Sequence, residues 1–272
     1  MTCTNPIGAH RAKKPNENGK YPLILNAGRD AQRDQALYVP CGKCFGCKAD
    51  RSLFWAIRCY HEASLHPVNS FLTLTYESAP DRLIKSDLQN FFKRLRHNYN
   101  FRYFACGEYG DQTHRPHYHA LIFGQDFRNG SFPVSDTLYS SPEISNSWGH
   151  GFVSIGDVSM SSCCYVVGYV YKKVGDEDTF VLMSRRPGVG SDWLSKYKDD
   201  LRRTGSVTIE GKEYPIPQRY LKWEDEYFMD VKEDRRLIFE ALSNEDFYKK
   251  QLTLPAREIN NKARISQRSK QL

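Results

Sequence analysis

The chain has 272 residues and a formal net charge of +7 at pH 7, and 13% of its residues are aromatic. It holds no apolar run near 18 residues, and its start lacks the pattern of a secretory signal, so neither a membrane span nor export is predicted. The positive charge suits a polyanionic partner, but many enzymes carry a similar charge, so it does not by itself indicate a function.

The first 40 residues are polar and rich in Lys, Asn, Gly and Pro, which predicts an irregular arm. A cluster of cysteines follows the arm, with the pattern Cys41-x2-Cys44-x2-Cys47. Thiolates at this spacing can converge on a structural zinc ion and leave one tetrahedral position open. The candidate for that position is Cys3, with Cys59 or His61 in reserve.

Two other interpretations of the cysteine cluster stay open. One is an iron–sulfur cluster, although the usual bacterial run continues with a fourth Cys where this chain has Arg51. The other is a set of free, reduced thiols. Eight cysteines without an export signal favour metal binding in a reducing compartment over disulfides.

Helical and strand patterns follow one another after the cluster. Apolar residues at helical spacing predict a helix over residues 48–65, and aromatic and β-branched residues predict a strand over 70–76. A second helix begins at Ser86, and its apolar face is formed by Leu88, Phe91, Phe92 and Leu95. The next two runs, residues 101–110 and 117–123, predict strands of a hairpin joined by a polar turn.

The second strand of this hairpin opens with His117-Tyr118-His119. Alternate residues of a strand share a face, so the two imidazoles are expected on one side, roughly 7 Å apart. The hairpin returns Glu108 to the same level. Two imidazoles and one carboxylate, with positions left for water or phosphate, suit Mg²⁺ or Mn²⁺.

A loop over residues 124–147 and an alternating strand over 151–158 precede the next motif, a helix that contains Tyr165, Tyr169 and Lys172. At about 100° per residue, Tyr169 lies roughly 40° from Tyr165 and Lys172 roughly 20° on its other side. The three side chains are therefore expected to form one polar stripe, with Lys173 at its margin. Gly168 lowers the stability of such a helix by about 1 kcal/mol, which indicates close approach of another group.

The last third of the chain gives weaker signals. Arg185 and Arg186 lie among glycines in residues 184–190, where guanidinium groups could contact phosphates; an ordinary basic turn fits nearly as well. Residues 207–216 predict a hairpin around Glu210-Gly211, and residues 223–248 a charged helical region. The basic run at 257–270 is typical of a disordered tail.

The order of these elements predicts an α+β fold, an antiparallel sheet with helices on one face. Three motifs in this order resemble those of HUH endonucleases, the rolling-circle replication initiators of small single-stranded DNA replicons: the strand at residues 71–76, the His-x-His strand, and the helix with Tyr-x3-Tyr-x2-Lys. The paired tyrosines resemble in particular the initiators of Microviridae phages of the gokushovirus type. Cys3, residues 40–47, Trp148-x2-Gly151 and residues 184–190 carry the same resemblance, which covers roughly residues 1–220. Tyr118 departs mildly from it, since many relatives have an aliphatic residue there.

The resemblance implies a ferredoxin-like or RNA-recognition-like core and a definite chemistry. A tyrosine hydroxyl attacks a phosphodiester of single-stranded DNA at the replication origin, which gives a 5′-phosphotyrosine and a free 3′-hydroxyl. Tyr165 and Tyr169 are the expected nucleophiles, and Lys172 would stabilise negative charge at the reacting oxygens. The implied partners are a host helicase and polymerase, and the implied location is the cytoplasm of the host bacterium.

Two other functions remain as alternatives: a related HUH relaxase or transposase, and a zinc-stabilised single-stranded DNA-binding protein without catalysis. In each case the chain divides into three parts. Residues 1–66 form an N-terminal arm with the Cys cluster and a helix, residues 67–175 an HUH endonuclease core, and residues 176–272 a C-terminal extension with a basic tail.

Overall fold

The computed structural model describes residues 3–17, 19, 21–25, 28–32, 37–110, 113–172, 179–240 and 253–268. It describes the helical backbone but not the side chains at positions 169–172, 236, 238–240, 261–262 and 264–268. Two compact units are present: Ser52–Arg235, and Met1–Arg51 together with Arg236–Leu272. The predicted functional division at residues 66 and 175 stays a prediction.

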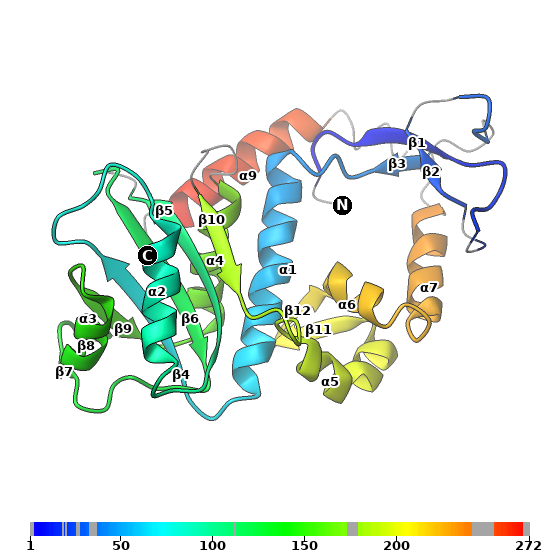
Figure 1. Ribbon diagram of the computed structural model, residues 1–272. Coiled ribbons are helices and arrows are strands. Elements are labelled where there is room, and N and C mark those ends of the chain that lie inside the picture. The colour runs from blue at the N-terminus through cyan, green and yellow to red at the C-terminus, as the bar shows by residue number, and fades with distance from the viewer. Residues whose placement is uncertain are drawn as a thin grey trace. The chain divides into compact units, whose positions relative to one another are not determined.

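The larger unit is built on an antiparallel sheet of seven strands (Figure 1). Their spatial order is β10-β5-β6-β4-β9-β8-β7. The strands are β4 (Asn69–Thr75), β5 (Arg102–Tyr109), β6 (Pro116–Phe123), β7 (Phe132–Pro133), β8 (Tyr139–Ser140), β9 (Val153–Gly156) and β10 (Phe180–Met183). The predicted α+β class is confirmed, and the predicted hairpin is formed by β5 and β6.

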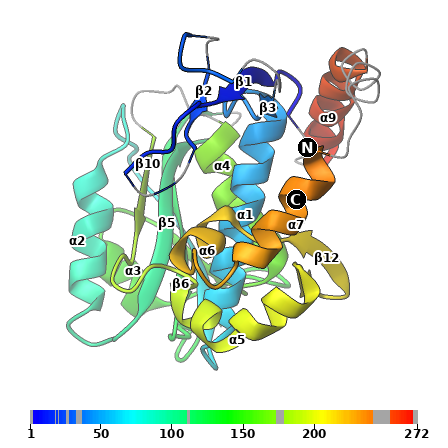
Figure 2. The ribbon, with the colours of Figure 1, turned by 90° about the vertical axis from the view of Figure 1, so that its right-hand side faces the viewer.

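Helices cover both faces of this sheet, so the expectation of helices on one face is wrong. The even-numbered residues of β4 and β6 form one core with α2 (Lys85–Leu95) and α3 (Pro142–Trp148). The odd-numbered residues of β6 face a second core, to which α1 (Phe45–Ser64) and α4 (Met160–Lys172) contribute. Figure 2 shows α2 and α4 on opposite sides of β5 and β6. Six of the eight residues of β6, from Tyr118 on, are buried, because a strand covered on both faces has no solvent side.

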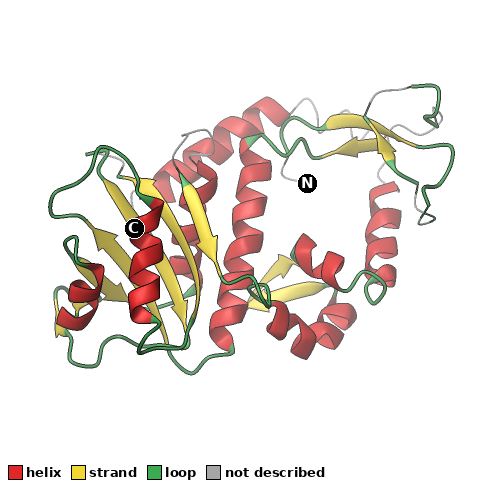
Figure 3. Ribbon diagram, viewed as in Figure 1, coloured by secondary structure: helices red, strands yellow, loops and turns green. Residues whose placement is uncertain are grey.

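The remaining elements of this unit extend the second core (Figure 3). They are α5 (Ser191–Thr204), the hairpin of β11 (Ser206–Ile209) and β12 (Lys212–Pro215), α6 (Gln218–Trp223) and α7 (Met229–Glu240), whose last residues belong to the smaller unit. The predicted hairpin around Glu210-Gly211 is confirmed. Leu194, Val207 and Tyr220 are buried together with Ile57 of α1, so this part of the chain is packed rather than appended.

The smaller unit departs most from the sequence-based expectations. The arm predicted to be irregular contains a three-stranded antiparallel sheet, β2-β1-β3, formed by β1 (Ile7–Arg11), β2 (Leu23–Ile24) and β3 (Leu37–Val39). The basic run predicted to be disordered forms the helix α9 (Leu254–Arg268) as far as it is described. Likewise, the loop predicted over residues 124–147 contains α3, β7 and β8. These elements were missed because their periodic patterns are short or lack large buried residues.

The Trp148-x2-Gly151 motif closes the end of β4. The Trp148 indole N–H donates to the Thr75 carbonyl at 2.9 Å, and the backbone of residues 150–152 pairs with residues 75–77. Gly151 has a φ of +150°, and a Cβ there would lie 2.4 Å from the Glu77 nitrogen. The position therefore requires glycine.

Two glycine variants should have opposite effects on stability. Gly151→Ala forces the backbone of β4 and residue 151 apart and should lower the free energy of unfolding by about 2–3 kcal/mol. The expected close approach at Gly168 is not found: among the described residues, nothing lies within 4 Å of a Cβ built there. Gly168→Ala should therefore raise the free energy of unfolding by about 1 kcal/mol. Urea unfolding followed by circular dichroism measures both, and equal effects would contradict this account.

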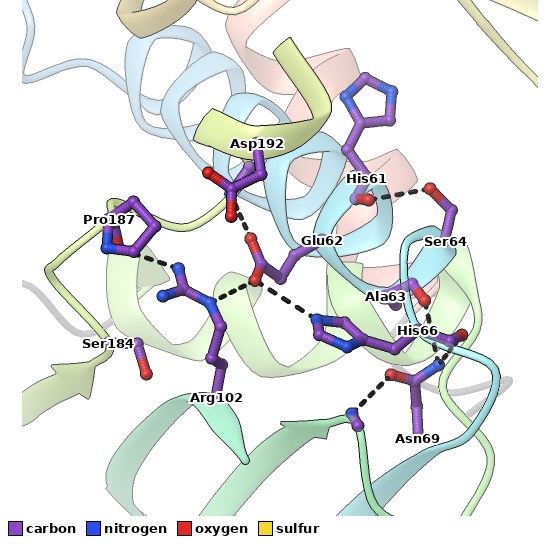
Figure 4. Close-up of polar contacts among 12 residues, drawn as sticks. His61, Glu62, Ala63, Ser64, His66, Asn69, Arg102, Ser184, Pro187 and Asp192 are labelled. Atoms are coloured by element: carbon purple, nitrogen blue, oxygen red, sulfur yellow. Dashed lines mark hydrogen bonds and ion pairs between the residues drawn. The ribbon is translucent and has the colours of Figure 1, made fainter. Parts of the chain in front are cut away.

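A buried carboxylate ties α1 to the turn that follows β10 (Figure 4). Glu62 is 1% exposed and pairs with the Arg102 guanidinium, while its second oxygen accepts the Gly190 backbone N–H at 2.7 Å. Arg102 also donates to the Pro187 carbonyl at 2.8 Å, and His66 lies 3.6 Å from Glu62. This network fixes both ends of the turn that carries Arg185 and Arg186.

Arg102→Ala should destabilise the larger unit by about 3–5 kcal/mol, because it leaves the Glu62 carboxylate buried without its cationic partner. Urea unfolding measures the change. Arg185→Ala is the matched control, since Arg185 is exposed, and it should change stability by less than about 0.5 kcal/mol. Equal losses in the two variants would contradict a structural role for the buried pair.

Candidate metal centre

The register of the hairpin brings Glu108, His117 and His119 to one point. Glu108 lies directly opposite His117 across the β5–β6 pair, and His119 follows two residues later on the same face. The Nε2 atoms of His117 and His119 lie 2.8 Å and 3.0 Å from Glu108 Oε1. Their candidate ligand atoms all lie within 4.8 Å of one another. Glu108 and His119 are buried, whereas His117 is partly exposed, so the site opens toward solvent at His117.

The outer ring nitrogens are held by polar groups of the same sheet. His117 Nδ1 lies 3.1 Å from the Arg115 carbonyl, and His119 Nδ1 lies 3.1 Å from Thr73 Oγ1 on β4. The Arg115 carbonyl can only accept, so His117 Nδ1 carries the proton of that contact. A neutral imidazole has one N–H, and His117 Nε2 then turns a lone pair toward the carboxylate. A cation is the group that satisfies such an arrangement.

The carboxylate shows the same need. Within the described part of the chain, Glu108 Oε2 is buried and has no hydrogen-bond partner. Burial raises the pKa of Glu108, but hydrogen bonds from His117 and His119 outweigh it and lower the pKa below its ordinary value. Burial also lowers the pKa of His119. An ionised carboxylate and a neutral imidazole are the forms that ligate a divalent ion, so these residues fit such an ion.

The helix α4 lies over this face of the sheet. The Tyr165 ring contacts the His119 ring edge-on, with centroids 5.1 Å apart, and also packs edge-on against Phe71 at 6.0 Å. Val166 and Val167 on the same helix are fully buried in the core beneath. Of the residues predicted for the tyrosine stripe, Tyr165 is therefore placed beside the triad.

The other members of the stripe are described less completely. Tyr169 and Lys172 lie in α4, but the structure does not describe their side chains. Lys173 lies outside the described residues. Their assignment as nucleophile, charge-stabilising group and DNA contact stays a prediction.

Arg185 and Arg186 lie at the opposite end of the sheet from the triad. Ser184 pairs with Tyr103 of β5, five residues before Glu108, which corresponds to roughly 17 Å along the strand. Both arginines are exposed in the turn after β10. The structure does not bring them to the reacting groups, so any contact they make with DNA is a contact with a flanking phosphate.

The four cysteines Cys3, Cys41, Cys44 and Cys47 form a second candidate metal group. The reserve ligands do not take part. Cys59 is buried in the core of the larger unit, and His61 stacks on Trp193 at 3.4 Å and lies 3.0 Å from the Tyr220 hydroxyl.

Two residues of the histidine site were missed by sequence reasoning, Thr73 and Arg115. Thr73 had a usable signal, because odd-numbered residues of the predicted strand 70–76 share one face, and a hydroxyl on that face can orient an imidazole. Arg115 acts through its backbone carbonyl, so its side-chain type carried no signal.

Comparison with known proteins bears on the same region. The profile of the replication-associated protein ORF2 family matches residues 69–174, which run from the first residue of β4 past the end of α4. The replication-associated protein VP4 of Bdellovibrio phage phiMH2K is 31% identical over 250 residues, covering 82% of this chain and 77% of the relative. The chain belongs to the replication-associated proteins of the Microviridae.

Two further members of the family are similar over much of the chain. The replication-associated protein ORF2 of Spiroplasma virus 4 is 28% identical over 278 residues, covering 88% of this chain and 87% of the relative. ORF4 of Chlamydia phage 1, also a replication-associated protein, is 31% identical over 211 residues, or 68% of this chain and 52% of the relative. No solved structure matches the chain. None of the described helices combines the length and apolar character needed to cross a membrane.

Proposed function

We propose that this protein initiates rolling-circle replication by nicking and rejoining single-stranded DNA at the origin, through a tyrosine–DNA intermediate. The observation that carries the proposal is the Tyr165 ring beside His119, in a triad of two imidazoles and a carboxylate. Membership of a family of replication-associated proteins supports the role in replication. The α+β sheet with β4, β5, β6 and α4 is consistent with an HUH-type core.

The proposed reaction exchanges one phosphoester for another. A tyrosine Oη forms a bond to phosphorus, the bond from phosphorus to the 3′ oxygen breaks, and the tyrosine proton is transferred so that a free 3′-hydroxyl results. The phosphoester is conserved, and rejoining by the reverse attack therefore needs no nucleotide cofactor. A divalent ion, Mg²⁺ or Mn²⁺, held by Glu108, His117 and His119 would polarise the phosphate as a Lewis acid.

The residues of the chain position the groups around that phosphate. Thr73 and the Arg115 carbonyl orient the imidazoles, and the burial of Val166 and Val167 fixes α4 on the sheet. Tyr165 and Tyr169, one helical turn apart, would alternate, one holding the DNA end while the other attacks the regenerated origin. Lys172 would stabilise the tyrosinate or the leaving oxygen, and Lys173, Arg185 and Arg186 would bind DNA phosphates.

The proposed setting follows from the family. Single-stranded origin DNA is the substrate, a host helicase and polymerase extend the free 3′ end, and the reaction takes place in the cytoplasm of the host bacterium. The sequence contains no Gly-x4-Gly-Lys-Ser/Thr loop, and unwinding is therefore assigned to the host.

The test is covalent capture of DNA. The full chain is incubated with end-labelled single-stranded oligonucleotides that tile the phage origin, with Mn²⁺ or with a chelator, and resolved on a denaturing gel. We expect a labelled protein band with Mn²⁺ and one origin oligonucleotide, and none with the chelator. Adducts formed on transposon ends or plasmid transfer origins instead would indicate a relaxase or transposase. Bound but intact DNA under every metal would indicate a binding protein without catalysis.

A further inference from the structure

The thiols of Cys3, Cys41, Cys44 and Cys47 meet at one point in the smaller unit. Their sulfur atoms all lie within 4.8 Å of one another. Cys3 Sγ and Cys44 Sγ are 3.7 Å apart, and Cys41 Sγ and Cys47 Sγ are 4.0 Å apart. A zinc ion with Zn–S bonds of about 2.3 Å places its four sulfurs about 3.8 Å apart at the corners of a tetrahedron. A disulfide would need about 2 Å, and all four cysteines are free.

Backbone N–H groups point at these sulfurs. Cys41 N donates to Cys3 Sγ at 3.3 Å, Cys44 N to Cys41 Sγ at 3.2 Å, and Thr4 N to Cys44 Sγ at 3.4 Å. Gly42 has a φ of +73°, which allows the tight turn between the first two cysteines of the cluster. Hydrogen bonds from N–H groups favour thiolates over thiols, and thiolates are the form that binds metal.

The sheet attached to these cysteines has no apolar core of its own. Among the described residues before Arg51, the buried apolar side chains are small: Ala9, Ala12, Ala31, Cys3 and Cys47. The larger ones, Ile7, Leu23 and Leu25, are exposed. Both hydrophobic clusters draw their described members from Leu53 onward. Three short strands without a hydrophobic face are not stable by burial alone.

The positions of the cysteines relative to the strands supply what the core does not. Cys3 precedes β1 and Cys41 follows β3, and these two strands pair with Ile7 opposite Val39. Cys44 and Cys47 lie at the start of α1. One ion bound by all four would therefore join both ends of the β1–β3 pair to the first turn of α1.

We propose that Cys3, Cys41, Cys44 and Cys47 bind one Zn²⁺, and that this ion replaces a hydrophobic core in the sheet of β1, β2 and β3. The ion takes no part in the DNA chemistry proposed above. All four positions are filled by protein sulfur, which is the closed coordination of a structural zinc site. A four-iron cluster distributes its cysteines over separate iron atoms, whereas these sulfurs are close enough to share a single ion.

The first test is the metal content of the full chain, measured by mass spectrometry after purification from zinc-supplemented cells. To remove the histidine site from the measurement, every protein carries His117→Ala and His119→Ala. We expect about one zinc per chain in this background and in Cys164→Ser, whose cysteine is exposed and outside the cluster. Cys3→Ser and Cys44→Ser should reduce the zinc content at least about tenfold after dialysis. Equal zinc content in all four proteins, or iron in place of zinc, would overturn the proposal.

The second test does not depend on cysteine variants that fold. The same background protein is stripped with a chelator and titrated with Co²⁺. Tetrahedral thiolate ligation gives strong charge-transfer absorption in the near ultraviolet, and Zn²⁺ should abolish it. In limited proteolysis, the stripped protein should be cut faster within residues 3–40, while residues 69–172 keep their protection. Absence of the charge-transfer band, or unchanged cleavage of the arm, would contradict the proposal whether or not the protein nicks DNA.

Discussion

A chain that carries both Tyr165→Phe and Tyr169→Phe should form no covalent adduct with origin DNA. Phenylalanine keeps the ring that contacts His119 and Phe71 but removes the only atom that can attack phosphorus. The rate of adduct formation should fall to less than about 10⁻³ of that of the unmodified chain, because no other nucleophile on α4 replaces a positioned hydroxyl. A denaturing gel of labelled DNA measures the adduct directly.

The single tyrosine variants and a neighbouring tyrosine complete this experiment. If the two hydroxyls alternate, each single variant should still form an adduct in one turnover but should fail to rejoin DNA in repeated turnovers. Tyr171→Phe is the matched control, since its helical position lies off the stripe formed by Tyr165, Tyr169 and Lys172, and it should keep full activity. An adduct in the double variant would refute the assignment of the nucleophiles, even if the DNA is still cut.

Removal of one imidazole should have the second largest effect. His117→Ala takes away a partly exposed ligand, so the sheet should stay folded, while Glu108 and His119 alone hold a divalent ion weakly. Nicking with saturating DNA and millimolar Mn²⁺ should slow by about 10²–10³-fold, the effect of losing a Lewis acid worth several kcal/mol. Titration calorimetry with Mn²⁺ on the DNA-free protein measures the loss of ion binding separately from the reaction.

Two further variants show whether this loss is specific to the site. His97→Ala changes an exposed histidine on another element and should leave both nicking and Mn²⁺ binding unchanged. Thr73→Val removes the hydroxyl beside His119 Nδ1 and should weaken Mn²⁺ binding by about 10–100-fold without abolishing it. If His117→Ala binds Mn²⁺ as tightly as the unmodified protein does, the triad is not the metal site.

The sequence located the elements of the site better than the faces they cover. Strand, hairpin and helix positions around residues 70–172 followed from local periodicity, and α2, β6 and α4 lie within a few residues of their predicted ranges. The helices on both faces were missed, although the unbroken apolar run of residues 120–123 in β6 is typical of a strand buried on both sides. The arm was also misjudged, because its short strands carry no large buried residues.

The sequence by itself determined that His117 and His119 share a face and that Tyr165 and Tyr169 share a stripe, because both relations depend only on residue spacing within one element. Tertiary structure decided which distant groups meet them. The register of β5 against β6 sets Glu108 opposite His117, and packing of α4 on the sheet sets Tyr165 beside His119. In the same way, the choice of Cys3 over Cys59 or His61 could not be made from spacing. Closing a loop costs only about 0.6 kcal/mol more for each doubling of its length, so packing rather than distance along the chain selects the partner.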